Sequence, residues 1–362
     1  MTGVARRIRR GVKEPVQRAL AWAAVRTLDV RPRTLEEVRA LKPRAIVAVR
    51  TDRIGDLLVS TPLIAALHRR WPDARLVVVT GPKNRAVLEG LPFVEAGPVF
   101  DRHPASWARV ARWFDGQPFD LAVSLCAEAM SGVYVSAASG APVRVATHAT
   151  KTAPAFNFIF GVDDHHHVTR NCRAAAMLGV PCAQMRPTFE IPEAERERAE
   201  QAVGSRWGAE GGPLVGVQVP SRSDRLHARQ SWPSERLVEL VGALAADGCR
   251  VVLFGVGSER VEAERIRVVV PAAELAPEGT LGFAAALLTR LDLLVSGFTG
   301  TYHLADAVGV PTVAIGTAHK VLYWGSHGPS HRLAVAERLT DVTLGGVLET
   351  VRGALAAGGA RP

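Results

Sequence analysis

The feature that most constrains this fold is a repeated alternation of short apolar strands with helices. From residue 44 onward, candidate strands at 45–49, 74–81 and 119–126 alternate with candidate helices at 62–71 and 83–91. Short apolar strands interleaved with helices of about ten to fifteen residues predict a parallel, doubly wound sheet. Ligands of such sheets bind outside the carboxyl ends of the strands. We therefore expect an α/β unit whose functional residues directly follow its strands.

The same rhythm begins again after residues 186–213, a segment rich in proline, glycine and charge that is typical of a linker with one exposed helix. Two such halves predict two Rossmann-like domains facing across a cleft. The expected order is a basic helical extension (1–40), a first Rossmann-like domain (41–190), a linker (191–212), a second Rossmann-like domain (213–340), and a C-terminal helix and tail (341–362).

The net charge of +9 belongs to the beginning of the chain. The first 50 residues hold thirteen basic and four acidic side chains, so their excess of nine equals the net charge of the whole chain. The remaining chain is electrically balanced, which argues against a nucleic-acid partner. Residues 3–29 read as two amphipathic helical pieces. Two interpretations stay open: contact with an anionic membrane surface, or packing of the apolar side on the protein body.

Composition indicates a folded protein of the cytoplasm. Hydrophobic residues make up 48% and charged residues 22% of the chain. We find no secretory leader and no apolar run of the roughly 20 residues that a membrane-spanning helix needs. Because no CxxC pair is present, we expect four reduced, mostly buried thiols; they are Cys126, Cys172, Cys182 and Cys249.

The segment SGFTGTYHLADAVGVP, residues 296–311, predicts an anion site at a helix start. Thr299 and Thr301 can cap a helix that begins near Tyr302, and Gly300 permits the tight turn before it. The free N–H groups of the first turn and the helix dipole favour a phosphate, and His303 lies near enough to donate to it. An ordinary strand–turn–helix junction would have the same sequence, so both interpretations stay open.

Two motifs in this order resemble the heptosyltransferase family, which transfers heptose from ADP-heptose to the lipopolysaccharide core. The first is R-x-D-x-x-G-D-x-x-x-x-x-P from Arg50 to Pro62. The second is T-G-x-x-H-L-x-x-A-x-x-x-P-x-x-x-x-G-T from Thr299 to Thr317. Trp232-Pro233, FGVGSE at 254–259 and HVTRN at 167–171 also match, so the resemblance runs from about residue 44 to residue 350.

The resemblance implies a GT-B fold and an inverting, metal-independent glycosyl transfer from a nucleotide-diphospho-sugar. It assigns Asp56 as the general base that takes the proton of the acceptor hydroxyl. A helix N-terminus would offset the charge of the departing diphosphate, so no metal or other cofactor is expected. The alternative for Asp56 is a helix N-cap.

The remaining candidate residues are those whose charge or position suits the donor and the acceptor that the resemblance implies. Arg222 and Arg229, together with Arg225, can supply positive charge to the diphosphate. Glu259 falls where a carboxylate can bind ribose hydroxyls, or it is a surface residue of the helix that follows. The expected acceptor contacts surround Asp56, although Arg50 and Arg53 could instead pair with neighbouring acids and Asp52 could be structural; they are Arg50, Asp52, Arg53 and Gly55.

Two departures from the family pattern leave the substrates open. Phe298 stands where the family usually has an aspartate, and Gln230 stands where it has a basic residue. The acceptor could be a glycan, a glycolipid or a natural product. A non-catalytic nucleotide- or glycan-binding protein and a nucleotide-sugar epimerase remain alternatives. We expect no metal at His165–His167, because three consecutive histidines converge poorly on one ion. Tyr323 and Trp324 line a base pocket or pack a loop.

Overall fold

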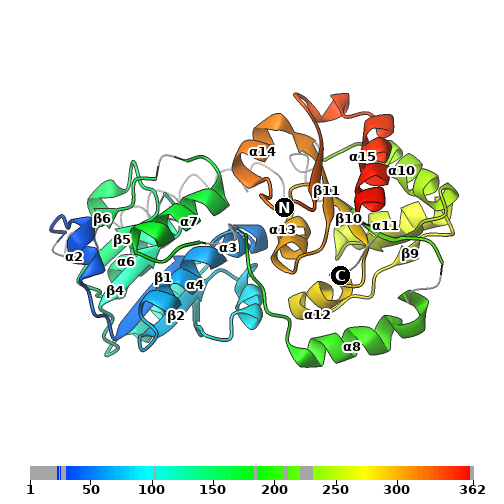
Figure 1. The fold of residues 1–362 in the computed structure, drawn as a ribbon. Helices are drawn as coiled ribbons and strands as arrows, with labels where there is room; N and C mark the ends of the chain where they lie inside the picture. Colours follow the sequence, from blue (N-terminus) through cyan, green and yellow to red (C-terminus); the bar gives the residue numbers. More distant parts are fainter. Residues whose placement is uncertain are drawn as a thin grey trace, which may run out of the picture. The chain divides into compact units, whose positions relative to one another are not determined.

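A computed structural model describes residues 30–358 apart from 102, 127, 163, 183–185, 208–210 and 221–230, together with Ala23 and Val25. The chain divides into two compact units, the first formed by residues 1–164 and 168–185 and the second by 165–167 and 186–362. Because only Ala23 and Val25 are described among residues 1–29, most of the expected N-terminal extension lies outside the described residues. Figure 1 shows that each unit combines strands with helices, and this confirms the expected α/β fold class.

The first unit contains a six-stranded parallel sheet in the order β3-β2-β1-β4-β5-β6. The direction of winding reverses between β1 and β4, which is where sheets of this kind bind ligands. Its strands are β1 (Ala45–Arg50), β2 (Arg75–Thr80), β3 (Glu95–Val99), β4 (Leu121–Ser124), β5 (Val143–Ala146) and β6 (Phe158–Ile159). Its helices are α2 (Leu35–Arg39), α3 (Ile54–Leu58), α4 (Thr61–Arg70), α5 (Pro104–Phe114), α6 (Met130–Ala138) and α7 (His167–Met177), with 3-10 turns η1 (Arg85–Gly90) and η2 (Ala153–Ala155).

The core of the first unit explains why its central strands read as continuous apolar runs. Every residue of β1 is buried, as expected for a strand covered on both faces. Side chains of α5 and α6 pack on β1, β2 and β4 in one hydrophobic cluster. Val25 is helical and only 6% exposed in the same cluster, so this position of the N-terminal segment packs on the protein body.

The prediction of a helix over residues 83–91 is wrong, because this segment forms the 3-10 turn η1 at Arg85–Gly90. The run is short and ends at Gly90, and Pro92 disfavours the helical conformation of Leu91. The connection continues through β3, and α5 then returns the chain to the sheet.

The second unit has the same arrangement, a six-stranded parallel sheet in the order β12-β11-β10-β7-β8-β9. Its winding reverses between β7 and β10. Its strands are β7 (Leu214–Gln218), β8 (Arg250–Phe254), β9 (Glu274–Leu275), β10 (Leu293–Ser296), β11 (Thr312–Thr317) and β12 (His331–Ala336). Its helices are α8 (Glu193–Val203), α10 (Ser234–Ala246), α11 (Ser258–Val269), α12 (Leu281–Leu288), α13 (Gly300–Ala307), α14 (Ala318–Trp324) and α15 (Leu344–Ala357), with 3-10 turns η3 (Gly204–Trp207) and η4 (Leu339–Asp341).

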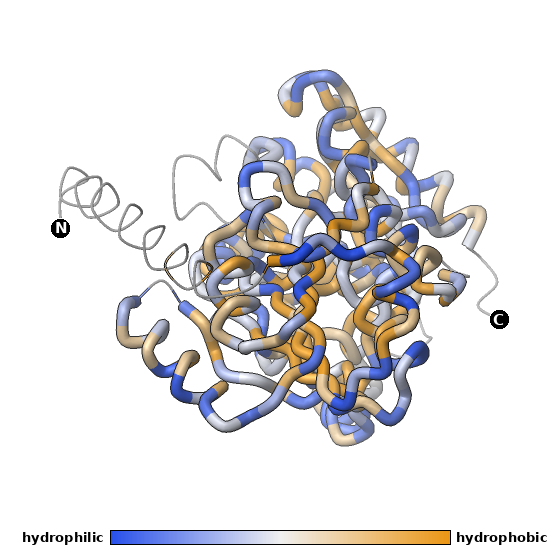
Figure 2. Tube along the Cα trace, turned by 90° about the vertical axis from the view of Figure 1, so that its left-hand side faces the viewer, coloured by the Kyte–Doolittle hydropathy of each residue, from blue (hydrophilic) through white to orange (hydrophobic). Residues whose placement is uncertain are grey.

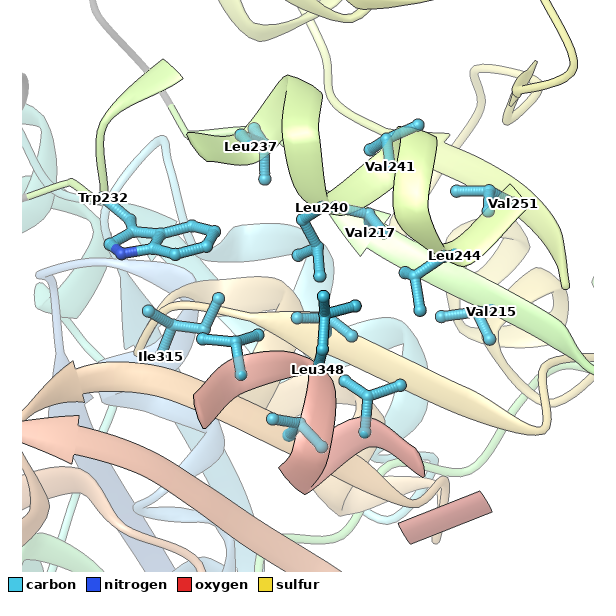
Figure 3. Close-up of a cluster of buried hydrophobic side chains, with 14 of the residues drawn as sticks. Val215, Val217, Trp232, Leu237, Leu240, Val241, Leu244, Val251, Ile315 and Leu348 are labelled. Carbon is cyan, nitrogen blue, oxygen red and sulfur yellow. The ribbon is translucent and has the colours of Figure 1, made fainter. Parts of the chain in front are cut away.

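One face of the second sheet is covered by α10, α11 and α15. Figure 3 shows Leu237, Leu240 and Leu244 of α10 facing Leu348 of α15 and the strand side chains between them. The helix α13 packs on β10 and β11 without contributing to this cluster. Figure 2 shows that hydrophobic and hydrophilic stretches alternate along the chain.

The segment expected to link the domains contributes a helix to the second unit. The helix α8 packs against α12. The hydroxyl of Thr280 donates to Glu195 at 2.6 Å, and Arg290 pairs with Glu200 at 2.5 Å. These contacts fix α8 to the second unit.

The expectation of four free thiols is wrong for two cysteines. Cys172 of α7 and Cys182 form a disulfide, with their Cα atoms 5.3 Å apart. Cys126 and Cys249 are free. No sequence pattern indicated this pair, because the two cysteines are ten positions apart and only the folding of the segment between them brings them together. Across the described residues, no helix is long and apolar enough to cross a membrane.

Candidate active site

The first motif lies at the point where the winding of the first sheet reverses. Arg50 is the last residue of β1, which pairs with β4, and residues 51–53 connect it to α3. Residues that follow the neighbouring strands β2 and β4 hold this connection in place. The amide of Asn84 donates to the Arg50 carbonyl at 3.0 Å, and the hydroxyls of Thr51 and Ser131 lie 2.7 Å apart. A Cβ at Gly81 would approach the Thr51 carbonyl oxygen to 2.3 Å, so only glycine fits beside this loop.

The carboxylate of Asp56 is held by two donors. The backbone N–H of Arg53 donates to its Oδ2 at 3.1 Å, and Nη2 of Arg50 donates to its Oδ1 at 3.1 Å. Asp56 is the third residue of α3 and Arg53 is the N-cap, so Asp56 is not the cap but satisfies the backbone of the cap residue. Each carboxylate oxygen can accept a further hydrogen bond, and the side chain is 17% exposed. The carboxylate thus stabilises the start of α3 and keeps unused acceptor capacity on a partly exposed side chain.

Arg50 lies between two carboxylates. Its Nε is 3.3 Å from Oδ2 of Asp52, and its Nη1 donates to the carbonyl of Leu125. The interpretation that Arg50 pairs with neighbouring acids therefore describes its contacts in this structure. The side chain of Arg53 is exposed, and Gly55 is buried in α3. Arg53, Asp52 and Gly55 remain predicted acceptor contacts.

The free cysteine of this unit lies beside the same loop. Burial, followed by the charge of Asp52, raises the pKa of Cys126 to about 11. Its thiol is 3.6 Å from the carbonyl of Val49. Cys126 is therefore a neutral packing residue at ordinary pH.

The second motif lies at the corresponding point of the second sheet. The turn 297–299 connects β10, which pairs with β7, to α13. Thr299 is the N-cap of α13, and its hydroxyl accepts the Tyr302 N–H at 3.4 Å. The N–H of His303 donates to the carbonyl of Thr299. In this first turn, the amides of Gly300 and Thr301 are the donors that remain for an anion.

Tyr302 and His303 belong to the first half of α13, and both side chains are buried. Tyr302 is fully buried, and its hydroxyl accepts the N–H of Ser326 at 2.8 Å. Burial raises its pKa. The His303 ring is 3% exposed and lies 5.1 Å from the ring of Tyr302 and 5.7 Å from that of Trp324. The predicted contact of His303 with a phosphate remains a prediction.

Glu259 lies just beyond the carboxyl end of β8, and sequence reasoning missed its partner. The amide of Gln218, the last residue of β7, donates to Oε2 of Glu259 at 3.2 Å. The N–H of Val256 donates to the same oxygen at 3.3 Å. Burial raises the pKa of Glu259. The available signal for Gln218 was a single polar residue near the end of the apolar run PLVGVQV.

Several predicted donor residues fall outside the described part of the chain; they are Arg222, Arg225, Arg229 and Gln230. Trp232 follows them and is anchored, because its indole N–H donates to the carbonyl of Val342 at 3.0 Å.

The histidine run packs against the end of α14. Nδ1 of His166 lies 3.2 Å from Nε2 of His327, and Nε2 of His166 contacts the Gly325 carbonyl. The rings of His167 and Trp324 are 4.0 Å apart. Trp324 therefore packs against the rings of both His167 and His303. Among the residues described, no group of three or more histidine, cysteine or acidic side chains could hold a metal ion.

Comparison with known proteins identifies the family. The family model for glycosyltransferase family 9 (heptosyltransferase) matches residues 107–342, which is more than half of the chain. The chain belongs to glycosyltransferase family 9. As a member of this family, it is a glycosyltransferase.

Individual members of the family are distant in sequence. Lipopolysaccharide heptosyltransferase 3 of Escherichia coli is 22% identical over 288 residues, which cover 75% of this chain and 82% of that protein. The glycosyltransferase family 9 structure from Veillonella parvula has a TM-score of 0.72 at 20% identity and covers 87% of this chain and 97% of its own. The structure of E. coli heptosyltransferase WaaC with ADP has a TM-score of 0.68 at 19% identity and covers 86% of this chain and 99% of its own. These structural similarities support the GT-B fold of the family 9 chain.

Proposed function

We propose that this family 9 chain transfers a sugar, heptose or a related one, from an ADP-linked donor to an acceptor hydroxyl, with inversion and without a metal. The acceptor is a glycan, a glycolipid or a natural product. The observation that carries the proposal is the placement of each motif at the carboxyl edge of its own sheet, where the winding reverses.

Asp56 acts as the general base. An acceptor hydroxyl is a weak nucleophile, and a positioned carboxylate removes its proton while the bond to the anomeric carbon forms. Arg50 and the Arg53 N–H fix the carboxylate without using all of its acceptor capacity. Arg53, which is exposed beside it, is the proposed contact for an anionic group of the acceptor.

The donor diphosphate binds at the start of α13. The amides of Gly300 and Thr301, the hydroxyl of Thr301 and the helix dipole offset the charge that develops on the leaving group. His303, Arg222 and Arg229 are proposed to add donors, and Glu259 to accept from the ribose. The solved structure of E. coli WaaC with ADP supports the choice of an adenine nucleotide.

A comparison of two carboxylates tests the role of Asp56. Both Asp56 and Asp52 contact Arg50, so Asp52→Asn removes a similar charge from the same guanidinium and is the matched control. We expect Asp56→Asn to lower the transfer rate by about 10²–10⁴-fold and Asp52→Asn to lower it far less, because only Asp56 takes the proton. Turnover is measured with ADP-heptose, and ADP affinity is measured by calorimetry.

The expected ADP affinity is unchanged in both variants, since the nucleotide contacts lie in the second unit. Near-normal turnover of Asp56→Asn would reject the general-base assignment. Equal losses in Asp52→Asn and Asp56→Asn would instead mean that the charge balance around Arg50 matters, and would also contradict it.

A further inference from the structure

Phe298 occupies the position immediately before the N-cap of α13. It therefore lies next to the proposed diphosphate site, in the turn between the end of β10 and the start of α13. Its side chain is partly exposed, although the residues on the next turn of α13 are buried. A partly exposed aromatic ring at the edge of a ligand site is available for contact with a substrate.

The ring of Phe298 is held in one orientation. It meets the ring of Tyr302 edge-on, with centroids 5.3 Å apart and an interplanar angle of 76°. Tyr302 is itself fixed by burial and by the Ser326 N–H. Phe298 also lies against Gly316 near the end of β11, where a Cβ would approach the ring to 2.4 Å. The absence of a side chain at Gly316 creates the space that the ring fills.

The surface beside Phe298 continues as an apolar one. Val335 of β12 pairs in register with Gly316, so its side chain points to the same face of the sheet as Phe298. Val335 is 38% exposed and Leu333, two residues earlier on the same face, is 41% exposed. The turn from 296 to 302, SGFTGTY, contains no acidic residue, so it offers no carboxylate to accept from a sugar hydroxyl.

This arrangement bears on the sugar of the donor. The sugar is bonded directly to the terminal phosphate, so its ring lies next to the start of α13 when the diphosphate is bound there. A hydroxyl pressed against an aromatic ring and a valine would lose its hydrogen bonds to water without replacement. A deoxygenated carbon or a methyl group would bury apolar surface at the same place.

We propose that Phe298 is a specificity-determining residue that contacts the transferred sugar and selects a donor with an apolar edge, a deoxygenated carbon or a methyl group, at that position. The inference rests on the proposed donor site at α13. It does not depend on the acceptor or on the role of Asp56.

Calorimetry tests this selection without an acceptor. The probes are ADP, an ADP-hexose, and a set of ADP-hexoses that each lack one sugar hydroxyl. For the wild-type protein, we expect at least one deoxy compound to bind about tenfold or more tightly than the parent, within the range known for single-group discrimination. Phe298→Leu keeps an apolar side chain and should retain the preference. Phe298→Asp should abolish it by offering an acceptor to the hydroxyl.

ADP alone serves as the internal control, because it carries no sugar. Its affinity should be the same in the wild-type protein and in Phe298→Leu, whereas the carboxylate of Phe298→Asp repels the diphosphate and should weaken ADP and all ADP-hexoses by a similar factor. If Phe298→Asp fails to bind ADP, Phe298→Ala replaces it, and the preference should still fall. A deoxy preference that is undiminished in Phe298→Asp or Phe298→Ala, or the absence of any deoxy preference in the wild-type protein, would overturn the inference while leaving the donor site standing. Failure of the wild-type protein to bind ADP and every ADP-hexose would overturn the donor site and this inference together.

Discussion

Glu259 is the carboxylate proposed to accept from the ribose, and folding changes its pKa. Burial raises its pKa, and the N–H donors of Val256 and Gln218 only partly oppose this effect. Its neutral form is therefore favoured in the folded protein relative to the unfolded chain. A raised carboxyl pKa contributes stability that is complete below the ordinary value of about 4.3 and is lost as the pH rises through the folded value.

The sign of this effect can be measured with Glu259→Gln, which keeps the shape but cannot ionise. We expect the free energy of unfolding of the wild-type protein, relative to that of the variant, to fall between pH 4 and pH 7. Urea unfolding of both proteins across this range measures the difference. A difference that rises with pH would mean that the folded state favours the ionised carboxylate, contrary to the burial of Glu259.

The two arginines of the first motif show how one residue type takes different roles in a short loop. Arg50 ends a buried strand and contacts Asp52 and Asp56, so its charge is used within the protein. The backbone of Arg53 fixes Asp56 while its side chain is exposed. The spacing of the motif places Asp56 one helical turn after the strand connection, where both contacts can reach it.

At the scale of elements, α13 and α15 provide a matched pair of capped helices. Thr299 caps α13 by accepting the Tyr302 N–H, and Thr343 caps α15 by accepting the Gly346 N–H at 3.1 Å. Substituting a threonine N-cap with alanine typically costs about 1 kcal/mol of stability. The hydroxyl of Thr299 also lies 3.1 Å from that of Ser296, and α13, unlike α15, carries the proposed diphosphate site.

We therefore expect Thr299→Ala and Thr343→Ala to lower the free energy of unfolding by similar amounts, about 1 kcal/mol each. Only Thr299→Ala should weaken ADP binding, because it loosens the first turn that presents the Gly300 and Thr301 amides. Urea unfolding and calorimetry measure the two quantities. Equal ADP affinities in the two variants, with both helices intact, would argue against a diphosphate at α13.

The elements that the sequence predicted well are those with an unambiguous apolar pattern. The strand at 45–49 and the helix at 62–71 were found within one residue at each end, as β1 and α4. The strand β3, EAGPV, was not predicted, because its glycine and proline are unfavourable in strands and only its pairing with β2 defines it. Tertiary contacts therefore define β3, and the local sequence pattern could not predict it.

For the whole molecule, the sequence predicted two α/β halves, and the structure adds their shared strand order. That order explains why both motifs follow the strands next to the reversal of winding. Sequence alone could not show that Asp56 contacts Arg50, that His303 is buried, or that Cys172 pairs with Cys182. Each depends on side chains brought together by loops whose conformation has no periodic signal. The assignment to family 9 came from motif order and was confirmed by the family model.

The central claim is a single displacement in which a base activates the acceptor and the diphosphate leaves from the opposite side of the sugar. The most direct test is the anomeric configuration of the product, measured by one-bond carbon–hydrogen coupling in NMR with an ADP-sugar donor of known configuration. The account predicts inversion, since one displacement reverses the configuration at the anomeric carbon. Retention would require a different mechanism and would contradict the assignment of Asp56 as a general base.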